Sequence, residues 1–439
     1  MTTSPTRVVI IGAGYTGIWA YKFLKARLGR KLTAGEVAVT VIASKNYHSF
    51  HGWTAESITG IISIPNRQSP VRPIYTGQTF LQATVVGVNL DQKTVSAQIL
   101  SSQRVEEVPF DYLLLANGSY DNMESVPGLH DYGYTVKAHG GVATTRNQLI
   151  RVLEVGNALP AGEEQDQWMT VVVGGGGIAG VEFSANIAEM YQAYKKFYPI
   201  LQRRKPRIVL IHSGAELLPV LRPKFNRLAD YCTRALADYG VEVILNTRIS
   251  QVTAQGAQLS NGQFIPSKTV LSTVGQRLTV LPGTEAFERT PKGQILTDEF
   301  LHVKGQSHVW ASGDTAYVMR INGEVAPTNA LWAIMEGKWA GENIAYTILG
   351  KQLKPFSYPG LGQVASVGVG KGAAEVYGVQ FTGWLGWLIR LGFFLYFQPS
   401  RQQALRILAD WLTLAFLGRQ MTIATEWQRE PENTHELAR

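Results

Sequence analysis

Short apolar runs alternate with amphipathic stretches along most of this chain. The runs at Val8–Ile11, Val171–Val173 and Ile208–Ile211 have the length and the β-branched content of buried strands. The first two lead directly into helical patterns. This alternation predicts an α/β fold in which helices cover mainly parallel sheets.

The first strand ends in a glycine-rich loop. Gly12, Gly14 and Gly17 have the Gly-x-Gly-x-x-Gly spacing of a dinucleotide-binding turn. The first glycine permits a tight turn, the second lets the backbone approach a pyrophosphate, and the third lets the helix pack on the strand. The phosphates would face the helix N-terminus, where free N–H groups favour negative charge. We therefore predict a nucleotide site rather than an ordinary strand–turn–helix.

A second copy of this loop begins 163 residues after Gly12, about one domain later. Gly175, Gly177 and Gly180 repeat the spacing, again between an apolar strand and a helical pattern. Two copies in the same context predict two Rossmann-type dinucleotide-binding domains. One would bind FAD and the other would bind the hydride donor, NADH or NADPH.

Three further strands are predicted to end at these sites. One ends at Gly118 and another at Gly313-Asp314, where the carboxylate would accept hydrogen bonds from the ribityl hydroxyls of FAD. A turn or helix cap is the alternative for Asp314. A third strand ends at Gly275, on the nicotinamide side. The order of these segments predicts that one domain is inserted in the other: residues 1–120 and 284–350 bind FAD, residues 121–283 bind NAD(P)H, and residues 351–439 form a C-terminal region.

Composition narrows the chemistry. Hydrophobic residues make up 45% and charged residues 17% of the chain, a balance typical of globular proteins. A single cysteine, Cys232, cannot form an internal disulfide or a redox pair, which excludes the thiol-dependent flavoenzymes. No His and Cys residues have metal-ligand spacing, so no metal site is expected. The first strand begins too early for an apolar signal segment, so we expect an intracellular protein.

The C-terminal region points to a membrane surface. The formal charge of +8 suits an anionic partner, and no nucleic-acid motif accompanies the basic residues. Residues 384–397 carry one charge, Arg390, and are too few to span a bilayer, which needs about 20 residues. A second helical pattern places one apolar face at Leu405, Leu408, Leu412 and Ala415. We predict amphipathic helices that lie in the membrane interface, with a homodimer interface or packing on the core as alternatives.

These segments together resemble the type II, non-proton-pumping NADH:quinone oxidoreductases, a branch of the two-dinucleotide-binding flavoproteins. The resemblance spans nearly the whole chain and includes Lys45–His48, Val181-Glu182, and Pro355–Tyr358 followed by the apolar run to Tyr396. It implies that hydride passes from NAD(P)H to FAD and that electrons then pass to a membrane quinone, without proton pumping.

The predicted site residues fall into three groups. The FAD site would comprise Gly12, Gly14, Gly17, Ser44, Lys45, Gly118, Gly313 and Asp314. The NAD(P)H site would comprise Gly175, Gly177, Gly180, His212, Ser213 and Gly275, with Glu182 as the catalytic residue beside the nicotinamide. The quinone side would comprise Trp332, Met335, Glu336 and Tyr396. For Glu182 the alternative is a carboxylate that only stabilises the start of its helix.

Both ribose-binding positions depart from the family pattern. Rossmann units normally carry an acidic residue where this chain has Ala43 in the FAD domain and His212 in the NAD(P)H domain. Ser44 would substitute for the missing ribose ligand of FAD. The loss of a carboxylate at position 212 removes repulsion against a 2′-phosphate. His212 and Ser213 would donate hydrogen bonds to this phosphate, and Arg222 follows soon after in the sequence. We hypothesise that NADPH is accepted.

The quinone side departs as well, because Leu331 and Met335 replace glutamines of the family. A different quinone or another acceptor therefore stays open. The leading hypothesis is a peripheral membrane NAD(P)H:quinone oxidoreductase on the cytoplasmic face. One rival is a soluble reductase of a protein such as ferredoxin. The other is a flavoprotein of the apoptosis-inducing-factor type, in which the nucleotide switches an interaction surface.

Overall fold

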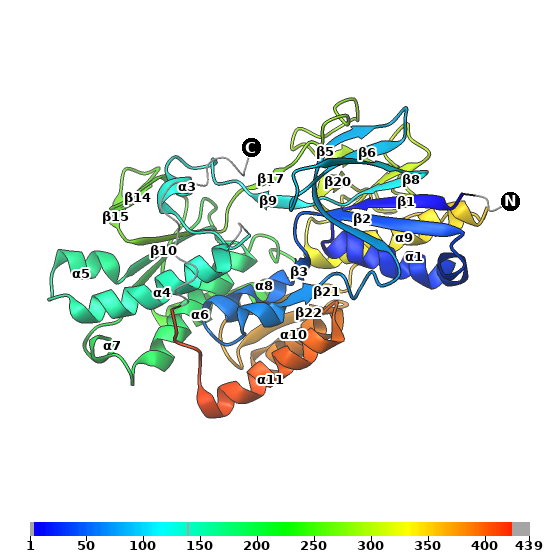
Figure 1. Cartoon of the computed structure of the whole chain (residues 1–439). Coiled ribbons are helices and arrows are strands. Elements are labelled where there is room, and N and C mark those ends of the chain that lie inside the picture. The colour runs from blue at the N-terminus through cyan, green and yellow to red at the C-terminus, as the bar shows by residue number, and fades with distance from the viewer. Residues whose placement is uncertain (1–3, 138–139, 424–439) are drawn as a thin grey trace. The chain divides into compact units, whose positions relative to one another are not determined.

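The chain forms two compact units, each assembled from three separate segments. The first unit comprises residues 1–49, 68–120 and 277–360, and the second comprises residues 50–67, 121–276 and 361–439. The computed structural model describes residues 4–137 and 140–423 (Figure 1). Each unit has its own parallel sheet, as the two separate strand–glycine–helix patterns require.

The first unit is built on a seven-stranded sheet with the order β19-β8-β1-β2-β5-β6-β7. These strands are β1 (Thr6–Ile11), β2 (Val37–Ala43), β5 (Thr79–Asn89), β6 (Thr94–Ile99), β7 (Val105–Pro109), β8 (Tyr112–Leu115) and β19 (Val309–Ala311). The strands from β19 to β5 are parallel, whereas β6 and β7 add antiparallel strands at one edge. The central strand β1 is buried from Val8 to Ile11 because neighbours cover both of its faces, which accounts for its continuous apolar run.

Two helices of the first unit, α1 (Tyr15–Thr33) and α9 (Ala330–Ile348), pack at backbone distance. A Cβ atom at Gly337 would lie 2.4 Å from the carbonyl oxygen of Thr16. A Cβ at Gly341 would lie 2.1 Å from that of Ala20. Glycines one turn apart on α9 therefore let this helix lie directly on the backbone of α1, the helix that follows the first glycine loop.

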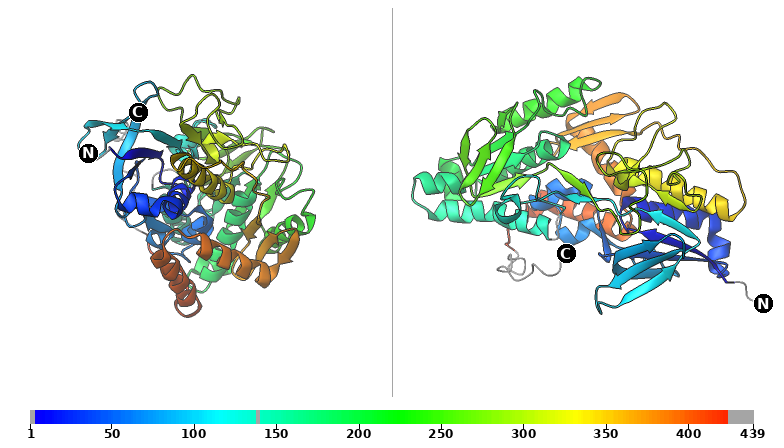
Figure 2. Two further views of the ribbon diagram at one scale, coloured as in Figure 1. Left: turned by 90° about the vertical axis from the view of Figure 1, so that its right-hand side faces the viewer. Right: turned by 90° about the horizontal axis from the view of Figure 1, so that it is seen from above.

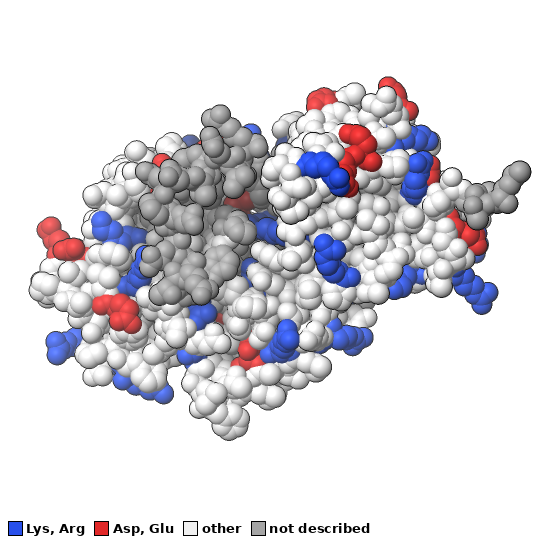
Figure 3. Space-filling view, viewed as in Figure 1, with Lys and Arg blue, Asp and Glu red and all other residues white. Residues whose placement is uncertain are grey.

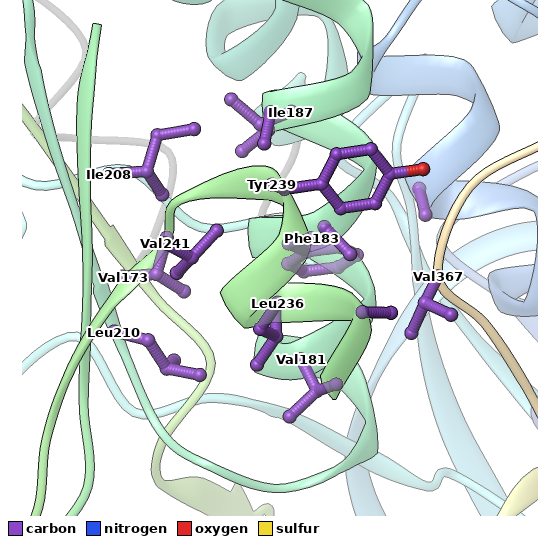
Figure 4. Close-up of a cluster of buried hydrophobic side chains, with 14 of the residues drawn as sticks. Val173, Val181, Phe183, Ile187, Ile208, Leu210, Leu236, Tyr239, Val241 and Val367 are labelled. Atoms are coloured by element: carbon purple, nitrogen blue, oxygen red, sulfur yellow. The ribbon is translucent and has the colours of Figure 1, made fainter. Parts of the chain in front are cut away.

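The second unit contains a four-stranded parallel sheet with the order β12-β11-β10-β16. Its strands are β10 (Thr170–Gly174), β11 (Arg207–Ile211), β12 (Glu242–Ile244) and β16 (Thr269–Ser272). The helices α4 (Gly141–Ala158), α6 (Ile178–Tyr194) and α8 (Asn226–Tyr239) accompany it. Figure 4 shows part of the core, in which Val173 and Leu210 from the strands face Phe183 of α6 and Leu236 of α8. An antiparallel sheet, β13 (Ile249–Thr253), β14 (Gly256–Leu259) and β15 (Phe264–Pro266), belongs to the same unit.

The C-terminal part of the second unit begins with an antiparallel sheet, β21 (Gly362–Ser366), β22 (Gly372–Val376) and β23 (Val379–Thr382). Two helices follow, α10 (Gly383–Phe397) and α11 (Arg401–Leu417), and the left view of Figure 2 shows them as separate helices. They match the two predicted helical patterns, and Pro399 lies in the break between them. Among the described residues, none of the helices is both long enough and apolar enough to cross a bilayer.

The remaining elements are short. They are β3 (Tyr47–Ser49), η1 (His51–Trp53), α2 (Thr54–Ile58), η2 (Ile64–Arg67), β4 (Gln68–Pro70), β9 (Ser119–Asp121), α3 (Leu129–Tyr132), α5 (Glu163–Trp168), α7 (Pro199–Arg203), β17 (Gln276–Leu278), β18 (Ile295–Leu296), η3 (Gly313–Thr315) and β20 (Ala316–Tyr317). Of these, η1, α2 and η2 lie in the segment 50–67, which belongs to the second unit although the chain on either side belongs to the first.

Candidate functional site: two dinucleotide cradles and a buried carboxylate

The first glycine loop has the geometry of a dinucleotide cradle. Gly12 has a φ of +109°, and a Cβ there would lie 2.1 Å from the carbonyl oxygen of Ala116, so a larger residue is excluded. Gly17 is equally confined, because a Cβ there would lie 1.9 Å from the carbonyl oxygen of Gly12. By contrast, a Cβ at Gly14 would meet nothing within 4 Å. The middle glycine thus faces open space at the start of α1, where a pyrophosphate would approach.

The second loop repeats this geometry position by position. Gly175 has a φ of +112° and abuts Thr273, and Gly180 packs on the carbonyl of Gly175 with a hypothetical Cβ only 1.7 Å away. Gly177 again has nothing within 4 Å. Because tightness at the outer glycines and openness at the middle one are what a bound pyrophosphate requires, both loops fit a dinucleotide.

The predicted FAD residues converge at the carboxyl ends of the parallel strands in the first unit. The Gly118 N–H donates to the hydroxyl of Thr315 at 2.9 Å, and the hydroxyl of Ser119 donates to Oδ2 of Asp314 at 2.6 Å. The loop after β8 and the turn after β19 are therefore bonded to each other. Asp314 is half-buried in this corner, as a ligand for flavin hydroxyls would be.

Glu336 is bonded into the same corner from α9. Its side chain is buried, and its Oε2 accepts from the N–H of Gly313 at 2.6 Å. Burial raises the pKa of Glu336 to about 8; the bond from Gly313 opposes this rise, and the nearby Asp314 adds to it. At neutral pH the carboxyl group of Glu336 is therefore mostly protonated, and it accepts the hydrogen bond that supports the turn with Asp314.

The other predicted residues of the first unit lie at the expected strand ends or on α9. Ser44 is exposed and Lys45 is half-buried directly after β2. Trp332 and Glu336 are buried on α9, whereas Met335 is only partly buried. Tyr396, the fourth residue predicted for the quinone side, is 79% exposed on α10 of the second unit. A quinone site formed by these four residues stays a prediction.

His212 occupies the ribose-binding position of the second loop. The Gly176 N–H donates to Nδ1 of His212 at 3.2 Å, so the neutral ring carries its proton on Nε2 and has a donor left to offer. The ring is wedged between Gly176 and Gly214, where Cβ atoms would lie 2.5 and 2.8 Å from it. Ser213 beside it is exposed, and Gly275 lies just beyond the end of the neighbouring strand β16.

Arg222 differs from the expectation. Its Nη2 donates to Asp230 at 2.6 Å, its Nη1 to Asn226 at 3.1 Å, and its Nε to the carbonyl of Leu217 at 3.3 Å. The guanidinium is therefore bonded to Leu217 and to the first turns of α8, and a role for it at a 2′-phosphate is not supported.

Glu182 lies inside a buried ion cluster that the sequence did not reveal. It stands in the first turns of α6, and its Oε1 accepts from the Ser366 N–H at 2.7 Å and lies 3.2 Å from Nη2 of Arg390. Arg390 also binds Glu56 of α2 at 2.5 Å. The signal available in the sequence was the lone charge of Arg390 within an apolar run, but its partners are 334 residues away at Glu56 and 208 away at Glu182 (390 − 182).

Comparison with known proteins places this geometry in a family. The model of the pyridine nucleotide-disulphide oxidoreductases matches residues 6–337, which is more than half of the chain. The chain belongs to this family. It is 26% identical over 422 residues to a Synechocystis protein named demethylphylloquinone reductase NdbB, with 94% of this chain and 97% of that protein covered.

A further relative and a solved structure with the same fold extend this comparison. A type II NADH:quinone oxidoreductase of Staphylococcus saprophyticus is 25% identical over 391 residues, covering 87% of this chain and 92% of that protein. A structure described as NDH2 from Plasmodium falciparum in complex with NADH superposes with a TM-score of 0.83 at 17% identity, covering 95% and 99% of the two chains. The resemblance stated from the sequence, the α/β fold and the oxidoreductase class are thereby confirmed. The roles of individual residues stay predictions.

Proposed function

We propose that this protein is an FAD-dependent NAD(P)H:quinone oxidoreductase that works at a membrane surface. The main support for the proposal is the pair of glycine loops, one in each unit. In both loops the first and third glycines are confined by neighbouring atoms and the middle one faces open space. Two dinucleotides bound by one chain are what hydride exchange between a nicotinamide and a flavin requires. The family, and the names of the relatives, support FAD as the cofactor, NADH as a substrate and a quinone as the acceptor.

When bound, FAD would accept two electrons as hydride and pass them on, so the protein has no bond-breaking step of its own to perform. Its residues would bind and orient. In the first unit, Gly14 would admit the pyrophosphate and Asp314 would hold the ribityl chain, supported by Ser119 and by the Gly313–Glu336 bond. In the second unit, Gly177 would admit the pyrophosphate of NAD(P)H, and Glu182 would meet the carboxamide of the nicotinamide.

For the coenzyme, we propose that NADPH is accepted together with NADH. A carboxylate at the ribose position repels a 2′-phosphate, whereas His212 offers an Nε2–H donor held in place by the Gly176 bond. Ser213 adds an exposed hydroxyl next to it. Equal or better kcat/KM with NADPH supports this proposal, and a tenfold preference for NADH contradicts it.

For the membrane, we propose that α10 and α11 lie on a lipid surface. The leucine face predicted for α11 is not used for packing, because Leu405 and Leu412 are exposed while Ile407 and Trp411 face the protein. The exposed face continues to Phe416, at 87% exposure, and to Trp384 of α10. Figure 3 shows the projecting end of α11 largely free of charge in that view. Such an apolar face, exposed in the described part of the chain, suits the interface of a bilayer.

Charge contributes less to this attachment than the sequence indicates. Residues 381–421 contain four arginines and one aspartate. Two of the arginines turn inward: Arg390 is buried and Arg419 forms a buried ion pair with Glu189 of α6. Only Arg401 and Arg406 are exposed. We therefore expect binding to lipid to depend mainly on apolar area and only weakly on salt.

Anaerobic stopped-flow spectroscopy tests the proposal directly. The purified flavoprotein is mixed with NADH or NADPH and then with a short-chain quinone. Bleaching of the flavin followed by reoxidation within the turnover time supports the assignment. Bleaching without reoxidation by quinone would favour a protein acceptor, and absence of bleaching with both nucleotides would favour an interaction role.

A further inference from the structure

A buried ion cluster joins the C-terminal helix α10 to the predicted catalytic carboxylate. Arg390 of α10 donates to both oxygens of Glu56, at 2.5 and 3.3 Å, and its Nη2 lies 3.2 Å from Oε1 of Glu182. The three side chains are 1%, 0% and 14% exposed. Segments from α2, α6 and α10, all in the second unit, thus meet at one cation.

The cluster does more than attach a helix. One cation between two carboxylates leaves a net negative charge in a buried place, which is costly unless one carboxyl group takes up a proton. Burial raises the pKa of Glu182 to about 7; Arg390 opposes this rise and Glu56 adds to it. Glu182 therefore changes its charge near neutral pH, and Arg390 and Glu56 act on that change in opposite directions.

The orientation of Glu182 is fixed as well. Both donors that reach it in the described part of the chain, Ser366 N–H and Arg390, bind Oε1. This leaves Oε2 for a ligand. Ionised, Oε2 would accept from the carboxamide N–H of a nicotinamide; protonated, it would donate to the carboxamide oxygen.

We propose that Arg390 is a positioning residue for Glu182, so that a side chain of the C-terminal helix decides the direction of the hydrogen bond between Glu182 and the nicotinamide carboxamide. This inference rests on the proposed function, which places Glu182 beside the nicotinamide. Arg390 is held for this role by a bond to the carbonyl of Gly52 at 2.8 Å and by the ring of Phe394, whose centroid lies 4.5 Å away.

In the described part of the chain, the ionisable groups that interact with Glu182 come from three elements. They are Arg390 of α10, Glu56 of α2 and Cys232 of α8. Burial, with a smaller contribution from Glu182, raises the pKa of the Cys232 thiol to about 12, so it stays neutral in the range tested. Removal of Arg390 should raise the pKa of Glu182, and removal of the charge on Glu56 should lower it.

The test is calorimetric binding of 1,4,5,6-tetrahydro-NADH, which keeps the carboxamide but cannot transfer hydride, to the full-length FAD-loaded protein between pH 5.5 and 9. The wild type should show a pH-dependent Kd with a midpoint near 7, and Glu182→Gln should show none. Arg390→Met should move the midpoint up and Glu56→Gln should move it down, each by about one unit or more. Arg390→Lys should restore most of the wild-type profile, and the exposed Arg401→Met is the matched control.

A purely structural role for Arg390 would weaken binding at every pH and leave the midpoint unchanged, or would move it in the same direction in both variants. Either result overturns the proposal. If Arg390→Met does not fold, Arg390→Gln, which keeps a hydrogen-bond donor but no charge, replaces it, and the same upward shift of the midpoint is expected. A wild type that binds the analogue independently of pH also overturns this inference but leaves the proposed function intact. A wild type that does not bind the analogue removes the proposed function itself.

Discussion

The contact between α1 and α9 allows a quantitative test of the first unit. At Gly341 a Cβ would lie 2.1 Å from the carbonyl oxygen of Ala20 and 2.8 Å from its Cα. The obstacle is helix backbone, which cannot rotate away as a side chain would. Gly341→Ala must therefore push the two helices apart. A matched control is Gly29→Ala on α1, where a Cβ would meet nothing within 4 Å.

The two substitutions should change the free energy of unfolding in opposite directions. Ordinary contact begins at 3.4 Å, so the clash at Gly341 asks for a shift of 1.3 Å (3.4 − 2.1). A gap of about 0.5–1 Å already forfeits a quarter to a half of each neighbouring dispersion contact. Overpacking costs about 1–3 kcal/mol, and a clash with helix backbone belongs in the upper part of that range, at about 2–3 kcal/mol. Replacing glycine by alanine in a helix gains about 1 kcal/mol in return. We expect a net loss of about 1–2 kcal/mol for Gly341→Ala and a gain of up to about 1 kcal/mol for Gly29→Ala.

Urea unfolding of the FAD-loaded protein measures both variants, with the release of flavin as the signal for the first unit. The midpoint should fall for Gly341→Ala and rise slightly for Gly29→Ala, at an unchanged slope. Because α9 also carries Glu336, the clash should loosen flavin binding as well. If Gly341→Ala is as stable as the wild type, the two helices are not in backbone contact and the account of α9 is wrong.

Three further outcomes are expected. In the folded protein the pKa of Glu336 is raised from 4.5 to about 8, so the unfolded chain loses this proton first and the free energy of unfolding falls as pH rises between these values. The stability of Glu336→Gln relative to the wild type should therefore increase over this pH range. Parallel pH profiles of the two proteins in urea unfolding would contradict this. His212→Asp should lower kcat/KM for NADPH relative to NADH by about tenfold or more in steady-state assays, and an unchanged ratio would show that the 2′-phosphate does not bind at His212. The double variant Leu412→Ser, Phe416→Ser should float less well with liposomes, while NADH should still reduce its flavin at the wild-type rate. If flotation is unchanged and light scattering shows that the substitutions break a dimer, the exposed face serves self-association instead.

The strand–loop–helix elements were predictable because their signals are local. A run such as Val8–Ile11 is apolar since it is covered on both sides, and the glycine that follows is required by the φ and the close approach seen at Gly12. The break between α10 and α11 was equally local, because Pro399 cannot continue a helix. These features depend on a few consecutive residues, and the structure reproduces them.

Features that depend on distant segments were not predictable. The segment 50–67 belongs to the second unit through partners such as Asp410, which accepts from Ser63 N–H at 3.0 Å and Asn66 at 2.8 Å. The pattern of apolar and polar residues in this segment does not predict that it belongs to the second unit. Likewise, the sequence shows an arginine at position 222 soon after a nucleotide-binding strand, but only the structure shows that Asp230 holds it. Polar pairing over long sequence separations leaves no repeating pattern to detect.

The arrangement of α10 also determines which experiments can separate membrane binding from catalysis. One side of the helix exposes Trp384 and Tyr396, whereas the other sends Arg390 to Glu56 and Glu182. Deletion of the C-terminal helices would remove the apolar face and, in the same step, leave two buried carboxylates without their cation. Loss of one partner of a buried ion pair costs about 3–5 kcal/mol, so a truncated protein would lose activity even if lipid had no part in turnover. Only substitutions confined to the exposed face, with Arg390 in place, can show what the membrane contributes.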